Sequence, residues 1–247
     1  LLTIGFLGTL ALLRALGYGR WGAVHVAALA YALAPRVLST LGAISPEAQT
    51  QLLAPLILLP LVLAGQGRLG TRRAAALPGV AILACGGVNA TATLLAAIPA
   101  GCWLVTRAAW WRSALTWSWA LAAAAATAWW LGPLILLGRY SPPFLNWIEN
   151  ARAVVKPIGL LDALKGTSHW LGHLLVPGGP WWPAGWAVAD TPSVVLASSI
   201  LAGISLAGLV VPVRERRFLL LTLFLGLALL VLPQSGPLAS PIAGTLR

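Results

Sequence analysis

The chain contains no methionine, only two cysteines and only five acidic residues among 247. Charged residues make up 9% of it, whereas a soluble domain averages about 25%, so the composition argues against a soluble globular protein. Cys85 and Cys102 lie four residues before and thirteen residues after Asn89, the last residue of a glycine-containing turn. Their depths along two helices would differ by more than about 10 Å, which excludes a disulfide. The missing methionine and the absence of a charged leader predict a fragment of a longer polypeptide without a signal peptide.

Long apolar runs dominate what is present, since 59% of the residues are hydrophobic. A spanning helix needs roughly 20 mostly apolar residues. The sequence therefore predicts an all-α, polytopic membrane protein with about eight transmembrane helices, the first one cut short. The predicted helices are Leu1–Leu13, Trp21–Val37, Gln49–Ala64, Ala74–Gly87, Ala90–Val105, Ala114–Leu137, Ser193–Val213 and Phe218–Leu232.

The charges orient these helices. One set of alternate loops carries most of the basic residues with one acid, Glu215: Arg14, Arg20, Arg68, Arg72, Arg73, Arg107, Arg112, Arg214, Arg216 and Arg217. The positive-inside rule places these loops in the cytoplasm, so the net charge of +11 is mainly an orientation signal and not a nucleic-acid site. The surplus also fits an acidic cytoplasmic partner or anionic lipid headgroups, with a simple topology signal as the alternative. The opposite side holds the other acids: Glu47, Glu149, Asp162 and Asp190.

The apolar segment 74–105 is predicted to be two helices. A single helix of that length would measure about 48 Å, well beyond a hydrocarbon core of about 30 Å. Gly86-Gly87-Val88-Asn89 provides the break. Both arms are short, so the turn either lies below the outer surface with Asn89 and Thr91 lining a polar niche, or is an ordinary tight hairpin.

The predicted organisation is helices over residues 1–137, an extracytoplasmic loop over 138–192, and two further helices with an outer tail over 193–247. In the loop, Arg139-Tyr140-Ser141-Pro142-Pro143 ends the preceding helix because the double proline removes donors. Two amphipathic interfacial helices are predicted to follow, Phe144–Val155 with Glu149 and Leu160–Leu175 with Asp162, His169 and His173 on its polar face.

His169 and His173 have the i, i+4 spacing of a metal-binding pair, but the glutamate of an HExxH motif is absent and Asp162 is the sole nearby further ligand. We therefore expect no metal site, while a divalent metal requirement stays open. Solvation of a polar face or a phosphate contact by one imidazole is the preferred role. The tryptophans at 181, 182 and 186 either anchor the loop at the interface or stack on a sugar ring.

Four segments in fixed order carry a family resemblance: LSTLGAISPE at 38–47, GGVNATAT at 86–93, WWLGPLILLGRYSPPF at 129–144 and GTSHW at 166–170. Together they resemble the membrane region of actinobacterial α-(1→3)-arabinofuranosyltransferases of the D type. The resemblance implies a class C glycosyltransferase fold at the plasma membrane with an extracytoplasmic active face. It also implies a polyprenyl-phosphate arabinose donor and an arabinan acceptor of the cell wall. Enzymes of this class usually take their catalytic base from an aspartate in the first outer loop, which is expected to precede Leu1, so the catalytic residue is unknown here.

Transfer from a lipid phosphate needs cations at the outer interface to stabilise the departing phosphate. Candidate residues for binding the donor phosphate or sugar lie in the outer loops: Arg36, Glu47, Asn89, Arg139, Tyr140, Glu149, Lys165, His169, Trp170 and Trp182. Glu47 is not assigned the role of base. A secondary transporter, which would carry ionisable residues inside its spans, and a non-catalytic membrane subunit remain the alternatives.

Overall fold

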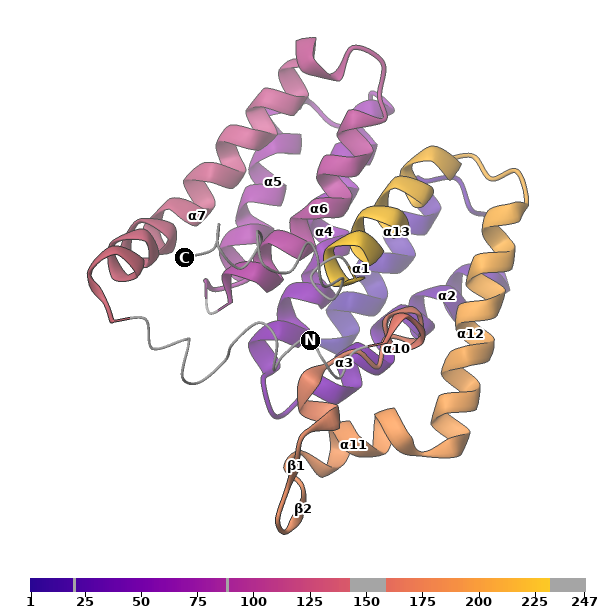
Figure 1. The fold of residues 1–247 in the computed structure, drawn as a ribbon. Helices are drawn as coiled ribbons and strands as arrows, with labels where there is room; N and C mark the ends of the chain where they lie inside the picture. The colour runs from indigo at the N-terminus through magenta and orange to yellow at the C-terminus, as the bar shows by residue number, and fades with distance from the viewer. Residues whose placement is uncertain (20, 88, 143–158, 232–247) are drawn as a thin grey trace.

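The structure, a computed structural model, describes residues 1–19, 21–87, 89–142 and 159–231. These residues are mostly helical, which confirms the predicted all-α class (Figure 1). The first half contains α1 Leu2–Ala15, α2 Trp21–Ala32, α3 Pro35–Thr40, α4 Ser45–Gly65, α5 Thr71–Ala84, α6 Ala90–Val105, η1 Trp110–Arg112 and α7 Ala114–Tyr140. The second half contains α10 Leu160–Lys165, η2 Trp170–His173, β1 Leu175–Val176, β2 Gly179–Pro180, α11 Pro183–Asp190, α12 Pro192–Val210 and α13 Arg216–Val231.

Within the described residues, four helical segments are long and apolar enough to cross a membrane: Gly22–Thr40, Ser45–Gly65, Ala114–Tyr140 and Pro192–Val210. The first of these joins α2 and α3 across Leu33 and Ala34, which are not helical. The remaining predicted spans correspond to α1, α5, α6 and α13, which have 14, 14, 16 and 16 residues. At 1.5 Å per residue these four helices measure about 21–24 Å, so the count of eight spans stays a prediction.

Two predicted helices are wrong in detail. The helix predicted over Trp21–Val37 ends at Ala32, and α3 begins at Pro35, because proline has no N–H to continue the first helix but fits the first turn of a new one. The helix predicted over Leu160–Leu175 ends at Lys165, because Gly166 adopts a left-handed conformation with φ 73°. Leu175 then begins β1, which pairs with β2 in a short antiparallel hairpin with Leu175 opposite Pro180. The other amphipathic helix predicted, Phe144–Val155, lies outside the described residues.

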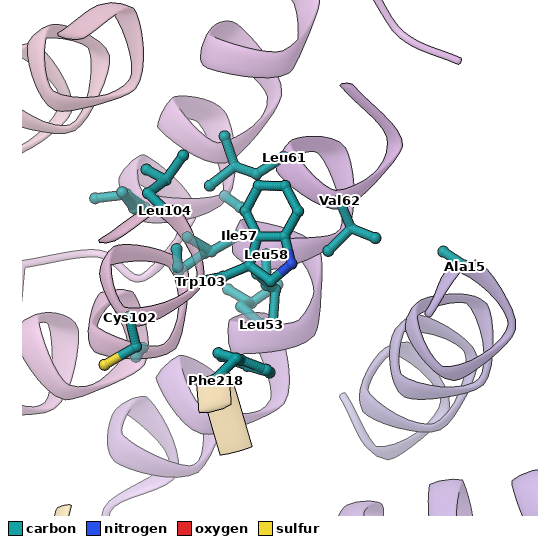
Figure 2. Close-up of a cluster of buried hydrophobic side chains, with 14 of the residues drawn as sticks. Ala15, Leu53, Ile57, Leu58, Leu61, Val62, Cys102, Trp103, Leu104 and Phe218 are labelled. Carbon is teal, nitrogen blue, oxygen red and sulfur yellow. The ribbon is translucent and has the colours of Figure 1, made fainter. Parts of the chain in front are cut away.

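Helix α4 is the centre of the packed region, where it contacts α1, α5 and α6. Leu53, Ile57, Leu58 and Leu61 of α4 meet Trp103 of α6 in the main apolar core (Figure 2). Small residues let these helices approach closely, as expected between membrane helices, where the hydrophobic effect does not drive association and close van der Waals packing does. A Cβ at Gly65 would stand 2.5 Å from the Trp103 ring, and one at Gly5 of α1 would stand 2.3 Å from Leu52.

The α5–α6 connection is confirmed as a break, since α5 ends at Ala84 and α6 begins at Ala90. The two arms do not form a closely packed hairpin, because each packs on α4 and α5 also lies along α7. The Asn89 end of α6 therefore meets the beginning of α4.

The segment from α10 to α11 folds over α3 at the same end of the molecule (Figure 1). Helix α11 contacts both α3 and η2, and a Cβ on Gly166 would stand 3.8 Å from the backbone nitrogen of Arg36. This contact brings two of the predicted outer-loop candidates, His169 and Trp182, to the helix ends that carry Arg36, Glu47 and Asn89.

Candidate functional site

Glu47 is the centre of a four-residue network, which we call the Glu47 cluster: Arg36, Glu47, Asn89 and His169. Glu47 lies in the first turn of α4, where a negative charge is favoured by the helix dipole. The chain reverses between α3 and α4 at Gly42, which has φ 99° and whose N–H donates to Ser45 Oγ at 3.1 Å. This tight turn places Arg36 beside Glu47 although eleven residues separate them.

Three donors from three different segments meet the Glu47 carboxylate. Arg36 Nη2 donates to Oε2 at 2.9 Å, and Asn89 Nδ2 donates to Oε1 at 2.9 Å. His169 Nε2 lies 3.3 Å from Oε2. Donors to a carboxylate stabilise its ionised form, so this arrangement holds an anion in a fixed position and makes it a weak proton acceptor.

Asn89 holds Glu47 and begins α6 with the same side chain. Its Oδ1 accepts a hydrogen bond from the Ala92 N–H at 2.9 Å, which is the standard role of an N-cap residue. Because one amide oxygen is fixed by the helix, the Nδ2 group is aimed at Glu47. Asn89 therefore bonds Glu47, whereas Thr91, the other residue predicted to line a polar niche at this turn, is exposed; the depth of the turn below a membrane surface stays a prediction.

His169 is only 1% exposed, and its contacts define its tautomer. The Leu171 N–H donates to His169 Nδ1 at 3.2 Å, so Nδ1 is unprotonated and Nε2 carries the proton that is donated to Glu47. Burial lowers the pKa of the imidazole, and the nearby Arg36 charge lowers it further, against the opposing effect of the Glu47 hydrogen bond. His169 is thus a neutral donor and not a second cation in the cluster.

Arg36 retains donors for an external anion. A guanidinium has five N–H groups, and within the described part of the chain Arg36 bonds Glu47 through Nη2 alone. Its side chain is 34% exposed, whereas that of Glu47 is 15% exposed. The carboxylate therefore fixes the guanidinium from the protein side while leaving part of it open to a phosphate or a sugar oxygen.

Lys165, another predicted phosphate contact, forms an ion pair with Asp162 within α10, with 3.1 Å between Lys165 Nζ and Asp162 Oδ1. Burial raises the pKa of the Asp162 carboxyl, but hydrogen bonds from Lys165 and the Gly159 N–H outweigh this effect and lower it overall.

His173 does not join His169, because its Nε2 lies 3.0 Å from the Thr167 carbonyl oxygen. Among the described residues, no group of three or more histidine, cysteine or acidic side chains is placed to hold a metal ion.

Two predicted tryptophans support the cluster without bonding Glu47. Trp182 donates its indole N–H to the Ser39 carbonyl at 2.9 Å, which ties the start of α11 to α3. The Trp170 ring lies against the His169 ring with 6.1 Å between centroids. The Trp182 contact holds α11 against α3, whereas the Trp170 contact joins two neighbours in the sequence. Whether the tryptophans anchor the loop at the membrane interface or stack on a sugar stays a prediction.

The remaining candidates lie elsewhere. Arg139 and Tyr140 are at the end of α7, which packs along α5 and lies away from α10 and α11 (Figure 1). Tyr140 is 80% exposed. Glu149 lies outside the described residues. The structure thus brings together Arg36, Glu47, Asn89 and His169, and it does not bring Arg139 or Tyr140 to them.

Sequence reasoning missed residues that support the cluster through backbone groups. Gln49 donates from Nε2 to the Ala84 carbonyl at 2.6 Å, which fixes the end of α5 near the start of α4. Thr167 is 2% exposed, and its hydroxyl donates to Asp162 Oδ1 at 3.4 Å. For Gln49, the sequence offers one indication of this supporting role, which is its position two residues after Glu47.

The opposite end of α6 carries a second ion pair. Arg107 pairs with Glu215, which precedes α13, and the Arg107 guanidinium lies 4.6 Å from the centre of the Trp103 ring. A cavity of about 740 Å³ opens there, lined in part by Arg214, Arg216 and Arg217. These arginines belong to the surface predicted to attract an acidic partner or anionic lipids, which stays a prediction.

Comparisons with known proteins agree with this architecture. Residues 1–247 match the family described as α-(1→3)-arabinofuranosyltransferase, N-terminal GT-C domain. The α-(1→3)-arabinofuranosyltransferases of Mycolicibacterium smegmatis and Mycobacterium tuberculosis are each 40% identical to the chain over 98% of its length. The chain spans 17% of the length of each of these curated relatives.

Solved structures give the same assignment. The cryo-EM structure of the arabinofuranosyltransferase AftD from mycobacteria is 31% identical, with a TM-score of 0.57 over 92% of this chain and 19% of that one. A mutant of AftD is 35% identical, with a TM-score of 0.55 over 98% of this chain and 20% of that one. The resemblance carried by the four sequence segments is therefore confirmed, and the chain belongs to the family of N-terminal GT-C domains of α-(1→3)-arabinofuranosyltransferases.

Proposed function

We propose that this chain is part of a plasma-membrane enzyme that transfers arabinofuranose from a polyprenyl-phosphate donor to a cell-wall arabinan on the extracytoplasmic face. Its relatives are named arabinofuranosyltransferases, and its apolar helices suit a membrane. The proposal includes eight spans and an outer loop over residues 138–192. The observation that carries the site assignment is the Glu47 cluster, in which a partly exposed arginine is held by a less exposed carboxylate.

The chemistry of transfer defines what the cluster contributes. The acceptor hydroxyl oxygen forms a bond to the anomeric carbon, the bond from that carbon to the phosphate oxygen breaks, and the phosphate departs with the electron pair. The hydroxyl proton goes to a carboxylate, which the family resemblance puts outside this chain. Arg36 is placed to stabilise the departing phosphate, because guanidinium donors bond phosphate oxygens in a fixed, paired geometry.

Glu47 acts in this scheme as a positioning residue. Removing or misplacing its carboxylate would free the guanidinium and leave the His169 and Asn89 donors without their acceptor. Three donors already occupy the carboxylate, so it is poorly suited to take the proton of the acceptor hydroxyl. The cluster therefore binds and orients the donor and does not supply the base.

The test is Arg36→Lys in the full-length enzyme, which keeps the charge but loses the planar set of donors. We expect kcat/KM for arabinose transfer to fall roughly 30- to 1,000-fold, with membrane insertion and yield unchanged. Arg216→Lys, at the opposite end of the molecule, is the matched control and should transfer normally. Equal activity in the two variants would remove the Glu47 cluster from the donor site.

A further inference from the structure

The cavity at the Arg107 end of α6 is lined by four arginines and one acid. The acid, Glu215, pairs with Arg107. Arg107 also donates from Nε to the Trp103 carbonyl and from Nη2 to the Thr106 hydroxyl, both at 3.2 Å, so its donors are used within the protein. The other three lining arginines are Arg214, Arg216 and Arg217. The cavity therefore has a surplus of three positive charges.

These three arginines are exposed where α12 is joined to α13 (Figure 1). Their side chains make no ion pair or hydrogen bond to any residue that the structure describes. Membrane orientation requires positive charge on this side, but it does not require that the charges line one cavity. Arg72 and Arg73, in the first turn of α5, are equally exposed and do not line it. Guanidinium groups that share a cavity and have open donors are suited to bind phosphate oxygens.

An exposed apolar stripe begins at this cavity and runs along α13. Leu221, Phe224 and Leu225 are 37%, 63% and 37% exposed, and Leu220 beside them lines the cavity. Counted from Arg217, the three exposed residues stand at i+4, i+7 and i+8, which is one face of a helix. From Phe218 to its end α13 carries no charged residue. A cationic cavity and an apolar stripe therefore adjoin on the same helix.

We propose that this cavity binds the phosphate headgroup of an anionic phospholipid whose acyl chains lie along the α13 stripe. The inference is independent of the proposed transfer reaction, because the cavity lies at the opposite end of α6 from the Glu47 cluster. An anionic phospholipid combines a phosphate with apolar chains, and the cytoplasmic leaflet that the arginine distribution predicts here is rich in such lipids. A free phosphate or an acidic protein segment would satisfy the arginines but would leave the apolar stripe in water.

The first test uses the unsubstituted full-length protein in phosphatidylcholine vesicles that contain a phosphatidylglycerol with a photoreactive diazirine near its headgroup. After irradiation the labelled peptides are identified. We expect labelling within residues 213–225 that unlabelled phosphatidylglycerol competes and additional phosphatidylcholine does not. The labelling should also fall when the salt concentration is raised from about 0.1 M to about 1 M, because salt screens exposed charges. Equal competition by phosphatidylcholine, or by water-soluble glycerol phosphate, would overturn the proposal.

The second test compares two pairs of arginines on the same predicted membrane side. Arg214→Gln with Arg217→Gln removes two of the surplus charges of the cavity, and we expect labelling affinity to fall roughly 10- to 30-fold. Arg72→Gln with Arg73→Gln removes the same charge outside the cavity and should leave the affinity within about twofold. Both pairs should insert into the membrane with the yield of the unsubstituted protein, since all four side chains are exposed.

Equal labelling of the two variant pairs would reduce Arg214 and Arg217 to an orientation signal and overturn the proposal. Cross-linking of residues 213–217 to an acidic protein in place of the lipid would assign the cavity to a protein and overturn it as well. Arabinose transfer is not measured in either experiment. Loss of the proposed function would therefore leave the lipid result intact, and absence of lipid labelling would leave the proposed function intact.

Discussion

The two ends of α6 each meet a glutamate, but they do so in different ways. At the Asn89 end, Glu47 receives one arginine and two neutral donors from three segments of the chain. At the Arg107 end, Glu215 pairs with one arginine beside a cavity lined by three more. The first arrangement fixes one cation with little surplus charge, as a binding site requires. The second leaves an excess of positive charge, as an orientation signal does.

The two ends also differ in the burial of a further partner, although their ion pairs are exposed to similar extents. His169 at the first end is almost fully buried, and α10, η2 and α11 lie over α3 there. The Arg107 and Glu215 side chains at the second end are 38% and 13% exposed, close to the 34% and 15% of Arg36 and Glu47. Groups that are held away from water interact more strongly with one another, so substitutions at the first end should have the larger effects.

The first prediction is that the two ends of α6 lie on opposite sides of a membrane. Its effect is the largest, because a labelled position is either accessible from outside the cell or not. Ser113 precedes α7 and Ser141 follows it, and the arginine distribution puts Ser113 in the cytoplasm. A cysteine at Ser141 should react with a membrane-impermeant maleimide added to intact cells, and a cysteine at Ser113 should react only after the cells are opened. Labelling of both positions in intact cells would contradict the proposed topology.

The second prediction compares the two glutamates by the same substitution in the full-length protein. Glu47→Gln removes the charged acceptor of Arg36 and His169, and we expect a loss of roughly 2–3 kcal/mol of site stabilisation, or about 30- to 150-fold in kcat/KM. Glu215→Gln alters a pair of similar exposure that joins the carboxylate to one arginine, and a partly exposed pair of this kind is worth about 1 kcal/mol or less. Its transfer activity should stay within about threefold of the wild-type value.

The outcome of this comparison separates a local role from a general one. Circular dichroism and yield should be the same for both variants, since neither substitution changes side-chain volume greatly. Equal loss of transfer in both would show that the two ends contribute alike and that the additional Asn89 and His169 donors on Glu47 have no functional consequence.

The third and smallest effect concerns pH. Because burial lowers the folded-state pKa of His169, the neutral imidazole stabilises the protein fully above its unfolded pKa of about 6.5. As the pH falls below this value, the unfolded state binds a proton before the folded state does, and stability is lost. The melting temperature of the full-length protein should therefore fall between pH 7.5 and 5.5.

His169→Gln should reduce this dependence, because glutamine keeps an N–H donor but does not titrate. Asp162, whose pKa is also lowered, loses its contribution below about pH 4 and does not interfere in this range. An unchanged slope in His169→Gln would mean that His169 is not the titrating group.

Much of the fold could be predicted from the sequence because long apolar runs have few alternatives in a membrane. The break between α5 and α6 follows from helix length and two glycines, and Asn89 was recognised at that turn. The prediction of one helix over Leu160–Leu175 was wrong, because the spacing of apolar residues does not reveal that a glycine within the segment adopts a left-handed conformation. Gly166 ends α10, and the buried packing of Leu171 and Gly172 against α11 outweighs local helix preference.

The candidate site was predicted as a set of residues but not as an arrangement. Charge and hydropathy predict one membrane side, the outer one, for Arg36, Glu47, Asn89 and His169. Their convergence on one carboxylate depends on how α3, α4, α6 and η2 pack, with 122 residues between Glu47 and His169. Arg139 has the same chemical character as Arg36, and only the three-dimensional structure distinguishes the arginine that Glu47 holds.

The double role of Asn89 restricts what evolution or an engineer can place there. As the residue that begins α6, aspartate would serve as well as asparagine. The Asn89 Nδ2 donor lies 2.9 Å from Glu47 Oε1. Aspartate would lose this donor and would place a second negative charge against the Glu47 carboxylate. Serine or threonine would begin the helix but carry a hydroxyl in place of the amide that reaches Glu47. The identity of this position is therefore set jointly by a helix and by a carboxylate on another helix, so that neither can be redesigned alone.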